Sequence, residues 1–312
     1  MKRVVVTGGA GFLGSHLCDA LVERGDEVVC VDNLSTGSKD NIEHLLDNPR
    51  FSVVLADICD GIEVQGPVDA VAHLACPASP PAYLSMPLET LRVGSRGTEV
   101  ALQLATVHHG RFLLASTSEV YGDPAVHPQP ESYWGSVNPV GPRSVYDEAK
   151  RFAESLTAAY RRTHKTNTGI VRIFNTYGPR LSPGDGRVMS NFIVQALSGQ
   201  PLTIYGGGSQ TRSFCYVDDL IRGLVAMIDS NLPGPVNLGN PIEMTVGDLA
   251  EKLISLTGSS SQIVYRALPA DDPARRRPDI ALAKAALGWE PGVDLDDGLA
   301  LTIEWFQERA QH

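Results

Sequence analysis

A tyrosine and a lysine four residues apart, Tyr146 and Lys150, are the residues of this sequence best suited to acid–base chemistry. They lie in a segment, 146–162, whose pattern predicts a helix, so both side chains are expected on one helical face. A nearby ammonium lowers the pKa of a phenol, and such a phenol can interconvert an alcohol and a ketone near neutral pH. The spacing is common by chance, so the pair alone also fits an ordinary surface contact.

Polar residues that follow a predicted strand over 111–116 strengthen the chemical interpretation. The sequence there is Ser116-Thr117-Ser118-Glu119. Parallel α/β proteins bind ligands at the carboxyl ends of their strands, so these side chains are expected at the edge where a ligand binds. Together, the hydroxyl of Thr117, the phenol of Tyr146 and the amine of Lys150 would position a substrate alcohol for hydride transfer.

A glycine-rich turn near the start of the chain indicates where a hydride acceptor binds. The stretch Thr7-Gly8-Gly9-Ala10-Gly11-Phe12-Leu13-Gly14 follows a predicted strand and opens a predicted helix. This matches the Gly-x-Gly-x-x-Gly turn that holds a pyrophosphate at a helix N-terminus. Asp32 ends the next predicted strand, where a carboxylate accepts hydrogen bonds from the adenosine ribose. The same carboxylate would repel a 2′-phosphate, and no arginine immediately follows it, so the pattern predicts NAD and not NADP.

The elements that position these residues alternate between strands and helices. Strands are expected at 2–7, 27–31, 51–56, 70–75, 111–116 and 168–173, and helices at 11–24, 86–108 and 146–162. This alternation predicts an α/β fold, a Rossmann-type doubly wound parallel sheet covered by helices on both faces. We expect residues 1–177 to form an NAD-binding domain, with return segments at about 213–238. Residues 178–312, where proline and glycine cluster, are expected to form mainly a smaller C-terminal α/β lobe that binds the substrate.

Composition narrows the classes of partner. The chain has 312 residues and a formal net charge of −10, which disfavours nucleic acid because such binding depends on Lys and Arg. Its apolar runs are shorter than the roughly 18 residues of a membrane span, and its first residues do not resemble a signal peptide. The 5 scattered cysteines fit a reducing compartment and no metal-ligand spacing. We therefore expect a cytoplasmic protein without a metal site.

The glycine turn, Asp32, Thr117 and the Tyr146–Lys150 pair together resemble the extended short-chain dehydrogenase/reductase family, which contains nucleotide-sugar epimerases, dehydratases and decarboxylases. The resemblance runs over essentially the whole chain. Six stretches are similar, more narrowly, to the family members that decarboxylate UDP-glucuronate: 73–81, 116–122, 172–180, 186–192, 210–214 and 277–280. It implies tightly bound, recycled NAD and conversion of UDP-glucuronate to UDP-xylose. The alternatives are a nucleotide-sugar 4-epimerase or 4,6-dehydratase, or a redox-sensing binding protein that has lost catalysis.

For the reaction, the resemblance implies a catalytic set made of Thr117, Ser118, Glu119, Tyr146, Lys150 and Arg276. Tyr146 would take the proton from the C4 hydroxyl, and the β-keto acid so formed would lose CO2 while Tyr146 or Thr117 holds the enolate oxygen. Arg276 would pair with the substrate carboxylate, because its planar fork binds a carboxylate through two hydrogen bonds. Arg275 and Arg277, its neighbours, fit a solvated basic patch.

Glu119 distinguishes between reactions within the family. Related dehydratases carry an Asp-Glu pair where this chain has Ser118-Glu119, and simple 4-epimerases usually have neither carboxylate. A single glutamate would orient the sugar ring, or a water, near C5 during decarboxylation. The alternative for Glu119 is an ion pair with an arginine.

The resemblance also implies two sets of binding residues. Those for the cofactor are Gly8, Gly11, Phe12, Leu13, Gly14, Asp32, Asn33, Thr36, Gly37, Asp57, Ile58, Leu74, Cys76, Tyr146 and Lys150. Those for the substrate are Arg92, Asn175, Arg187, Asn191, Tyr205, Gln210, Arg212 and Arg276. In this acidic protein, Arg92, Arg187, Arg212 and Arg276 are expected to gather positive charge in one cleft for a substrate that carries phosphates and a carboxylate.

The family pattern and this sequence differ at Gly94. Relatives usually have asparagine at this position, and glycine cannot supply the side-chain hydrogen bond that the asparagine makes. We therefore expect either a looser site around Gly94 or replacement of that hydrogen bond by Ser95.

The family also implies a homodimer, formed by the helix at 86–108 and the helix that carries Tyr146. The apolar face made by Phe152, Leu156 and Ala159 permits such a contact. The same face also fits a position in the core.

Overall fold

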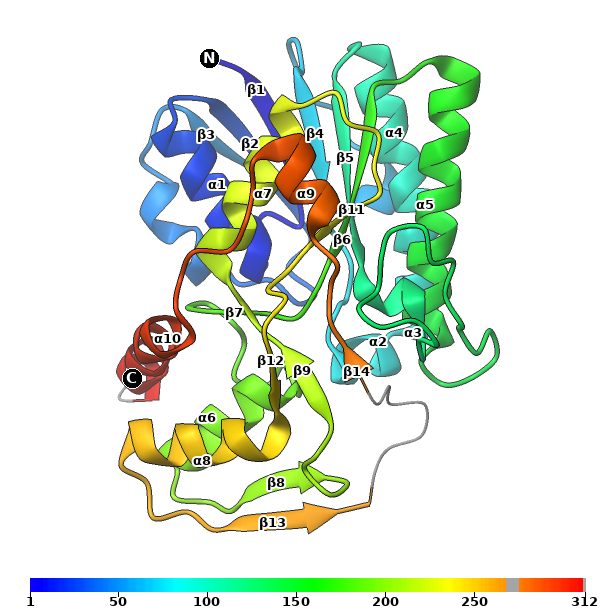
Figure 1. The fold of residues 1–312 in the computed structure, drawn as a ribbon. Helices are drawn as coiled ribbons and strands as arrows, with labels where there is room; N and C mark the ends of the chain where they lie inside the picture. The colour runs from blue at the N-terminus through cyan, green and yellow to red at the C-terminus, as the bar shows by residue number, and fades with distance from the viewer. Residues whose placement is uncertain (268–274, 311–312) are drawn as a thin grey trace.

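A seven-stranded parallel sheet forms the larger lobe of the protein. In the computed structural model, which describes residues 1–267 and 275–310, its strands lie in the order β3–β2–β1–β4–β5–β6–β11 (Figure 1). Residues 268–274 and 311–312 of the expected substrate lobe lie outside the described residues. The strands are β1 (Arg3–Thr7), β2 (Glu27–Asp32), β3 (Phe51–Leu55), β4 (Ala70–His73), β5 (Arg111–Thr117), β6 (Thr168–Ile173) and β11 (Val236–Leu238). The predicted Rossmann-type parallel sheet is confirmed.

Helices cover both faces of this sheet because its strands are apolar on both sides. In β1, Val4 and Val6 pack in the core with α1 and α7, whereas Val5 packs in the core with α4 and α5 (Figure 1). These helices are α1 (Phe12–Glu23), α4 (Thr98–Val107), α5 (Ser144–His164) and α7 (Val217–Asp229). None of the helices within 1–267 and 275–310 combines the length and apolar character needed to cross a membrane.

Elements from late in the chain, α7, β11 and α9 (Ala281–Leu287), also lie in the larger lobe. Helix α7 packs against α1, and β11 pairs with β6, with Val236 opposite Val171 and Leu238 opposite Ile173. Helix α9 in turn packs against β11 and α7. The larger lobe therefore combines the strands β1 to β6 with these later elements.

The smaller lobe is built from short strands and helices and lies below the large sheet in Figure 1. Its strands pair over long sequence separations, β8 with β13, and β9 with both β12 and β14. Their bounds are β8 (Leu202–Tyr205), β9 (Thr211–Ser213), β12 (Glu243–Thr245), β13 (Ile263–Arg266) and β14 (Arg275–Arg276). Helices α6 (Val188–Leu197), α8 (Val246–Thr257) and α10 (Leu295–Ala310) complete the lobe, and the parallel pair β7 (Thr176–Tyr177) and β10 (Cys215–Tyr216) connects it to the sheet.

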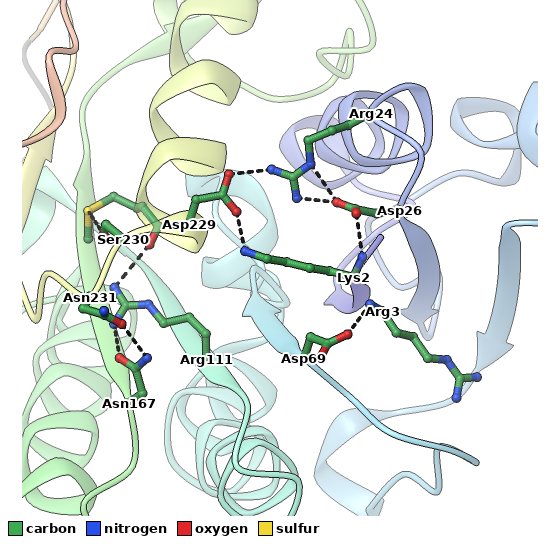
Figure 2. Close-up of polar contacts among 11 residues, drawn as sticks. Lys2, Arg3, Arg24, Asp26, Asp69, Arg111, Asn167, Asp229, Ser230 and Asn231 are labelled. Carbon is green, nitrogen blue, oxygen red and sulfur yellow. Dashed lines mark hydrogen bonds and ion pairs between the residues drawn. The ribbon is translucent and has the colours of Figure 1, made fainter.

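A network of ion pairs and hydrogen bonds lies at the amino ends of the strands, opposite the edge where ligands bind. Lys2, just before β1, pairs with Asp229 at the end of α7 with its Nζ 2.6 Å from Oδ1, and Arg24 pairs with the same carboxylate at 2.7 Å (Figure 2). Asp26 accepts a hydrogen bond from the backbone N–H of Lys2 at 2.8 Å. This network joins α1, β1 and α7 and lies away from the strand ends where a site is expected.

The helical segment predicted at 86–108 is divided by a π-helical turn, Val93–Gly97, between α3 (Pro87–Arg92) and α4. Gly94 lies in this turn, where a Cβ atom would come within 2.6 Å of the Ala149 Cβ on α5. The hydroxyl of Ser95 donates to the Leu91 carbonyl at 2.7 Å and therefore stays within its own helix. The expectation of a looser site is wrong, because α5 packs directly on the glycine backbone. Replacement of the asparagine hydrogen bond by Ser95 stays a prediction.

Gly94→Asn, which introduces the residue usual in relatives, is expected to destabilise this chain by about 1–3 kcal/mol, because an overpacked contact must displace α5. Urea unfolding measures the change, with Arg96→Asn as a control on the exposed side of the same turn, expected within about 0.5 kcal/mol of the parent. A Gly94→Asn variant as stable as the parent would contradict the close packing.

Candidate active site

One cavity of about 1240 Å³ lies between the carboxyl edge of the sheet and the smaller lobe. All the residues expected to bind cofactor line it, namely Gly8, Gly11, Phe12, Leu13, Gly14, Asp32, Asn33, Thr36, Gly37, Asp57, Ile58, Leu74, Cys76, Tyr146 and Lys150. The remaining expected residues line it too: Arg92, Thr117, Ser118, Glu119, Asn175, Arg187, Asn191, Tyr205, Gln210, Arg212 and Arg276. The structure therefore brings both sets to one cavity, with Arg92 nearer to the cofactor residues than the other substrate arginines.

The glycine turn leaves space that side chains would fill. Gly8 has a φ of +73°, and a Cβ there would lie 2.7 Å from the Ala75 nitrogen at the end of β4. A Cβ on Gly14 would lie 2.0 Å from the Gly8 carbonyl oxygen, so this glycine lets α1 approach the turn. Gly11 precedes the first residue of α1 and directs the helix N-terminus toward the cavity. This arrangement fits a dinucleotide pyrophosphate, which binds to exposed backbone N–H groups.

Asp32 organises the neighbouring part of the cavity. One carboxylate oxygen accepts the Ala10 N–H at 2.9 Å, and the other accepts the Leu34 N–H at 2.8 Å. Burial raises the pKa of Asp32, and the backbone hydrogen bonds act in the opposite direction. Asn33 donates to Asp57 at 3.3 Å and connects the loops after β2 and β3. A ribose hydroxyl that donates to Asp32 would satisfy the remaining lone pairs of this buried carboxylate.

Tyr146 and Lys150 lie on one face of α5, as the spacing predicts. The Lys150 Nζ lies 5.9 Å from the centre of the Tyr146 ring and donates to the Ala115 carbonyl at 2.9 Å. Burial raises the pKa of Tyr146, whereas its hydrogen bond with Thr117 acts in the opposite direction. Burial is therefore the largest influence on the pKa of this phenol in this structure.

A second tyrosine, Tyr83, supports the Tyr146 ring and was not among the expected site residues. The rings stack with their centres 5.2 Å apart and their planes 9° apart. Tyr83 comes from α2 (Pro80–Ser85), a short helix that begins with two prolines. Its sequence context carries no catalytic signal, so only the packing of α2 against α5 identifies it.

Glu119 is held by two arginines, as in the ion-pair alternative considered for it. Arg276 donates through both terminal nitrogens, with one Nη 2.7 Å from Oε2 and the other bonded to Oε1. Arg143, another residue outside the expected set, donates to Oε2 at 2.7 Å. Burial would raise the pKa of Glu119, but Arg276 and Arg143 outweigh it and lower this pKa to about 2. The Arg276 fork therefore holds a carboxylate of the protein in this structure.

Three of the four expected cationic residues approach the same part of the cavity. Arg276 on β14 lies in register beside Arg212 on β9, and both are buried. Arg187, just before α6, pairs with the buried Asp185 at 2.6 Å, and its charge is close enough to Tyr146 to influence that phenol. These arginines form a positive surface toward which a substrate phosphate or carboxylate is attracted.

Arg92 departs from this arrangement. At the end of α3, it pairs with the exposed Asp60 at 2.5 Å, next to Asp57 and Ile58. Arg92 therefore lies beside residues expected to bind the cofactor, because α3 ends next to the 3-10 turn Ile58–Asp60, whose Asp60 carboxylate attracts the guanidinium. Its expected role in substrate binding stays a prediction.

The remaining substrate-side residues lie in the smaller lobe and in the loop after β6. Asn191, in the first turn of α6, donates to the Gly186 carbonyl at 2.9 Å. Gln210 donates to the backbone carbonyl of Tyr205, whose ring is half exposed at the end of β8. Asn175 follows β6, and its carbonyl accepts the Cys215 N–H at 2.9 Å. These hydrogen bonds fix the loops and leave the Tyr205 ring available to a flat base.

Asp147, the residue after Tyr146, is a buried carboxylic acid beside this network. Its Oδ1 has no hydrogen-bond partner among the described residues. Burial and the charge of Glu119 raise its pKa to about 7, against the opposing charges of Arg143 and Arg276. The folded chain thus retains this proton at pH values where an unfolded aspartate has lost it.

The free energy of unfolding of the wild type is expected to fall as the pH rises from 5 to 8. This fall should be larger, by on the order of 2 kcal/mol, than the fall measured for Asp147→Asn. The sign follows because the folded state binds more protons than the unfolded state between the ordinary pKa of 3.8 and about 7. Urea unfolding at both pH values measures the difference. Glu148→Gln, which alters the partly exposed neighbour, should retain the wild-type pH dependence; equal dependence in Asp147→Asn would contradict the assignment.

Comparison with known proteins agrees with this geometry. A family model described as the NAD dependent epimerase/dehydratase family matches residues 4–239. UDP-glucuronic acid decarboxylase 1 of Danio rerio is 51% identical over 311 residues, which cover 100% of this chain and 74% of that protein. UDP-glucuronic acid decarboxylase 3 of Arabidopsis thaliana is 51% identical over 308 residues, which cover 98% of this chain and 90% of that protein.

Solved structures with other reactions have the same fold. UDP-glucose 4-epimerase of Thermotoga maritima superposes with a TM-score of 0.91 at 31% identity, over 99% of each chain. dTDP-glucose 4,6-dehydratase of Streptomyces venezuelae gives a TM-score of 0.91 at 30% identity, over 99% of this chain and 98% of its own. The predicted family is confirmed, and this chain belongs to the NAD dependent epimerase/dehydratase family.

Proposed function

We propose that this protein decarboxylates UDP-glucuronate to UDP-xylose. The observation that carries the proposal is the presence, in one cavity, of a buried phenol suited to alcohol oxidation and buried arginines suited to anions: Tyr146 beside Thr117, and Arg276 beside Arg212. The 51% identity to UDP-glucuronic acid decarboxylases along the whole chain supports the same substrate. A uronate substrate explains why a fork-shaped cation lies close to an alcohol-oxidising phenol.

The cofactor of the proposed reaction is NAD, held tightly and recycled. The glycine turn would hold its pyrophosphate, and Asp32 would accept its adenosine ribose hydroxyls. When bound, NAD supplies the acceptor for a hydride and, in its oxidised form, a positive charge that lowers the pKa of a neighbouring phenol. The overall reaction is not an oxidation, so one cofactor molecule can serve many turnovers.

In the first step, Tyr146 takes the proton of the C4 hydroxyl while C4 loses a hydride and becomes a ketone. The C5 carboxylate is now β to that ketone. Its bond to C5 breaks, CO2 leaves, and the electron pair moves into an enolate whose oxygen accepts a hydrogen bond from Tyr146 or Thr117. A proton then adds to C5, a hydride returns to C4, and Tyr146 returns its proton to the C4 oxygen. The net change is the uptake of one proton and the loss of one CO2.

The proposal is tested by incubating purified protein and NAD with UDP-glucuronate that carries ¹³C in its carboxyl group. Labelled CO2 and UDP-xylose, identified by NMR, are expected. Cofactor released by denaturation should be NAD at close to one per chain if it is held tightly. Formation of a 4-epimer or of a 4-keto-6-deoxy sugar nucleotide without CO2 release would contradict the proposal.

We also propose that the protein is a homodimer that uses the surface of α2, α3 and α5. Support comes from exposed apolar side chains on these helices, Leu84, Leu88, Leu91 and Phe152, since such patches mark association surfaces. Leu156 instead packs partly into the core beside α4, so it is not offered to a partner. Light scattering that gives a monomer at micromolar concentration would contradict the dimer.

A cytoplasmic location is the remaining part of the proposal. It is supported by the cysteines of the described residues, which are all free: Cys18, Cys30, Cys59, Cys76 and Cys215. Unpaired, mostly buried thiols are typical of proteins in a reducing compartment.

A further inference from the structure

Arg143 donates a hydrogen bond to the carboxylate of Glu119 inside the cavity. It immediately precedes α5 and is three residues before Tyr146, so the first turn of that helix fixes its backbone. Its side chain lines the cavity and is 18% exposed, and its Nη2 lies 2.7 Å from the Glu119 Oε2. Arg143 is therefore part of the cavity wall and not of the outer surface.

The two arginines hold Glu119 in different ways. Arg276 spans both carboxylate oxygens, and Arg143, from a different part of the sequence, donates to Oε2. If the Arg276 fork leaves, Oε2 keeps a charged donor. The arrangement is thus suited to a carboxylate that exchanges one cation and retains the other.

The proposed reaction requires such an exchange. If Arg276 binds the carboxylate of UDP-glucuronate through its planar fork, it cannot hold both Glu119 oxygens at the same time. A buried carboxylate left without a cation would take up a proton, because an unpaired charge in that environment is costly. A protonated Glu119 could no longer accept hydrogen bonds from the sugar or from a water near C5 through both oxygens.

We propose that Arg143 is a positioning residue that keeps Glu119 ionised when Arg276 turns to the substrate carboxylate. This inference rests on the proposed function, because in it Arg276 pairs first with Glu119 and then with the carboxylate of UDP-glucuronate. It also gives selectivity for uronates, because a sugar without a carboxylate leaves the Arg276–Glu119 pair closed.

The groups that face Glu119 come from several elements and must be separated in the test. They are Arg276 on β14, Arg143 and Asp147 at the start of α5, Tyr146 on α5, Tyr83 on α2 and Arg187 before α6. Of these, Asp147 titrates closest to neutral pH and is the group that could be mistaken for Glu119.

The experiment compares the pH dependence of CO2 release for wild type, Arg143→Met and Arg143→Lys. The kcat profile of Arg143→Met is expected to show a new acidic limb with an apparent pKa between about 5 and 8, below which kcat falls about tenfold per pH unit. The limb is expected because burial, no longer opposed by Arg143, raises the pKa of Glu119. Wild type should show no such limb from Glu119, and KM should change much less than kcat. Arg143→Lys, which keeps the charge, should move the limb back toward the wild-type position.

Two further variants assign the limb. Asp147→Asn combined with Arg143→Met should keep the limb if it belongs to Glu119. Glu119→Gln combined with Arg143→Met should remove it. Superimposable wild-type and Arg143→Met profiles, or loss of the limb with Asp147→Asn, would overturn the inference.

The proposed function and this inference fail separately. Absence of CO2 release by wild type rejects the function. In that case, ¹³C NMR of glutamate carboxyl groups, with Glu119→Gln to assign the resonance, still measures Glu119 titration with UDP-glucuronate bound. An unchanged titration in folded Arg143→Met or Arg143→Lys would reject the role of Arg143 by itself.

Discussion

Tyr146→Phe should lower the rate of CO2 release by about 10²- to 10⁴-fold, the range expected when a general acid–base group is removed. The phenylalanine ring can keep the stacking on Tyr83 at 5.2 Å, so the fold and cofactor binding should be retained. Because the phenol takes the first proton, the variant should also fail to reduce bound NAD in a single turnover. Nicotinamide absorbance and CO2 release, measured in parallel, check both results.

The matched control is Tyr83→Phe, which removes a hydroxyl from the other member of the stacked pair. Tyr83 is not assigned to proton transfer in the proposed reaction, and a phenylalanine in its place can keep the stacking on Tyr146. Loss of this hydroxyl should reduce the rate far less than Tyr146→Phe. Equal losses in the two variants would mean that the stack, and not the Tyr146 proton, limits the reaction.

Arg276→Ala should abolish decarboxylation while leaving NAD binding close to that of wild type. The change removes the fork proposed for the substrate carboxylate, and loss of such a preorganised donor costs about 10²- to 10³-fold in kcat. It also leaves Glu119 with Arg143 as its charged partner from the present pair. Rates of CO2 release and the dissociation constant of NAD are the two measurements.

The neighbouring Arg277 provides a control for Arg276. It is partly exposed and lies 3.7 Å from the Glu243 carboxylate, a pair expected to contribute less than about 1 kcal/mol. Arg277→Ala should therefore have little effect on CO2 release. If Arg276→Ala weakens NAD binding as much as it slows decarboxylation, then Arg276 has a structural role, because its ion pair connects β14 to Glu119.

The cofactor side of the site could be predicted from sequence because its signals are local. Gly8, Gly14 and Asp32 lie within one strand–helix–strand unit, and Tyr146 and Lys150 lie within one helix turn of each other. Local hydrophobic patterns therefore place them without knowledge of distant contacts. The same reasoning gave the strands of the parallel sheet as far as β6.

The substrate side could be predicted only in part, because it depends on pairings between distant segments. Arg276 lies beside Arg212 through β14–β9 pairing, and Glu119 meets Arg276 across 157 positions of sequence. Arg143 has no motif of its own, and the ion pair of Arg92 could not be foreseen because its partner, Asp60, comes from another loop. The close packing at Gly94 has the same origin, since the contact that excludes a side chain is with Ala149 on α5.

The position of α7 over the sheet has a consequence for the growing chain on the ribosome. One face of the central strand β1 is covered jointly by α1 and α7, and Lys2 pairs with Asp229 over a separation of 227 residues (Figure 2). A nascent chain that ends near residue 177 therefore has its cofactor turn but lacks α7 and β11, and exposes the apolar face that contains Val4 and Val6. Such partly covered sheets aggregate readily. Completion of the larger lobe therefore waits until α7, β11 and α9 have been synthesised, well after the dinucleotide segment.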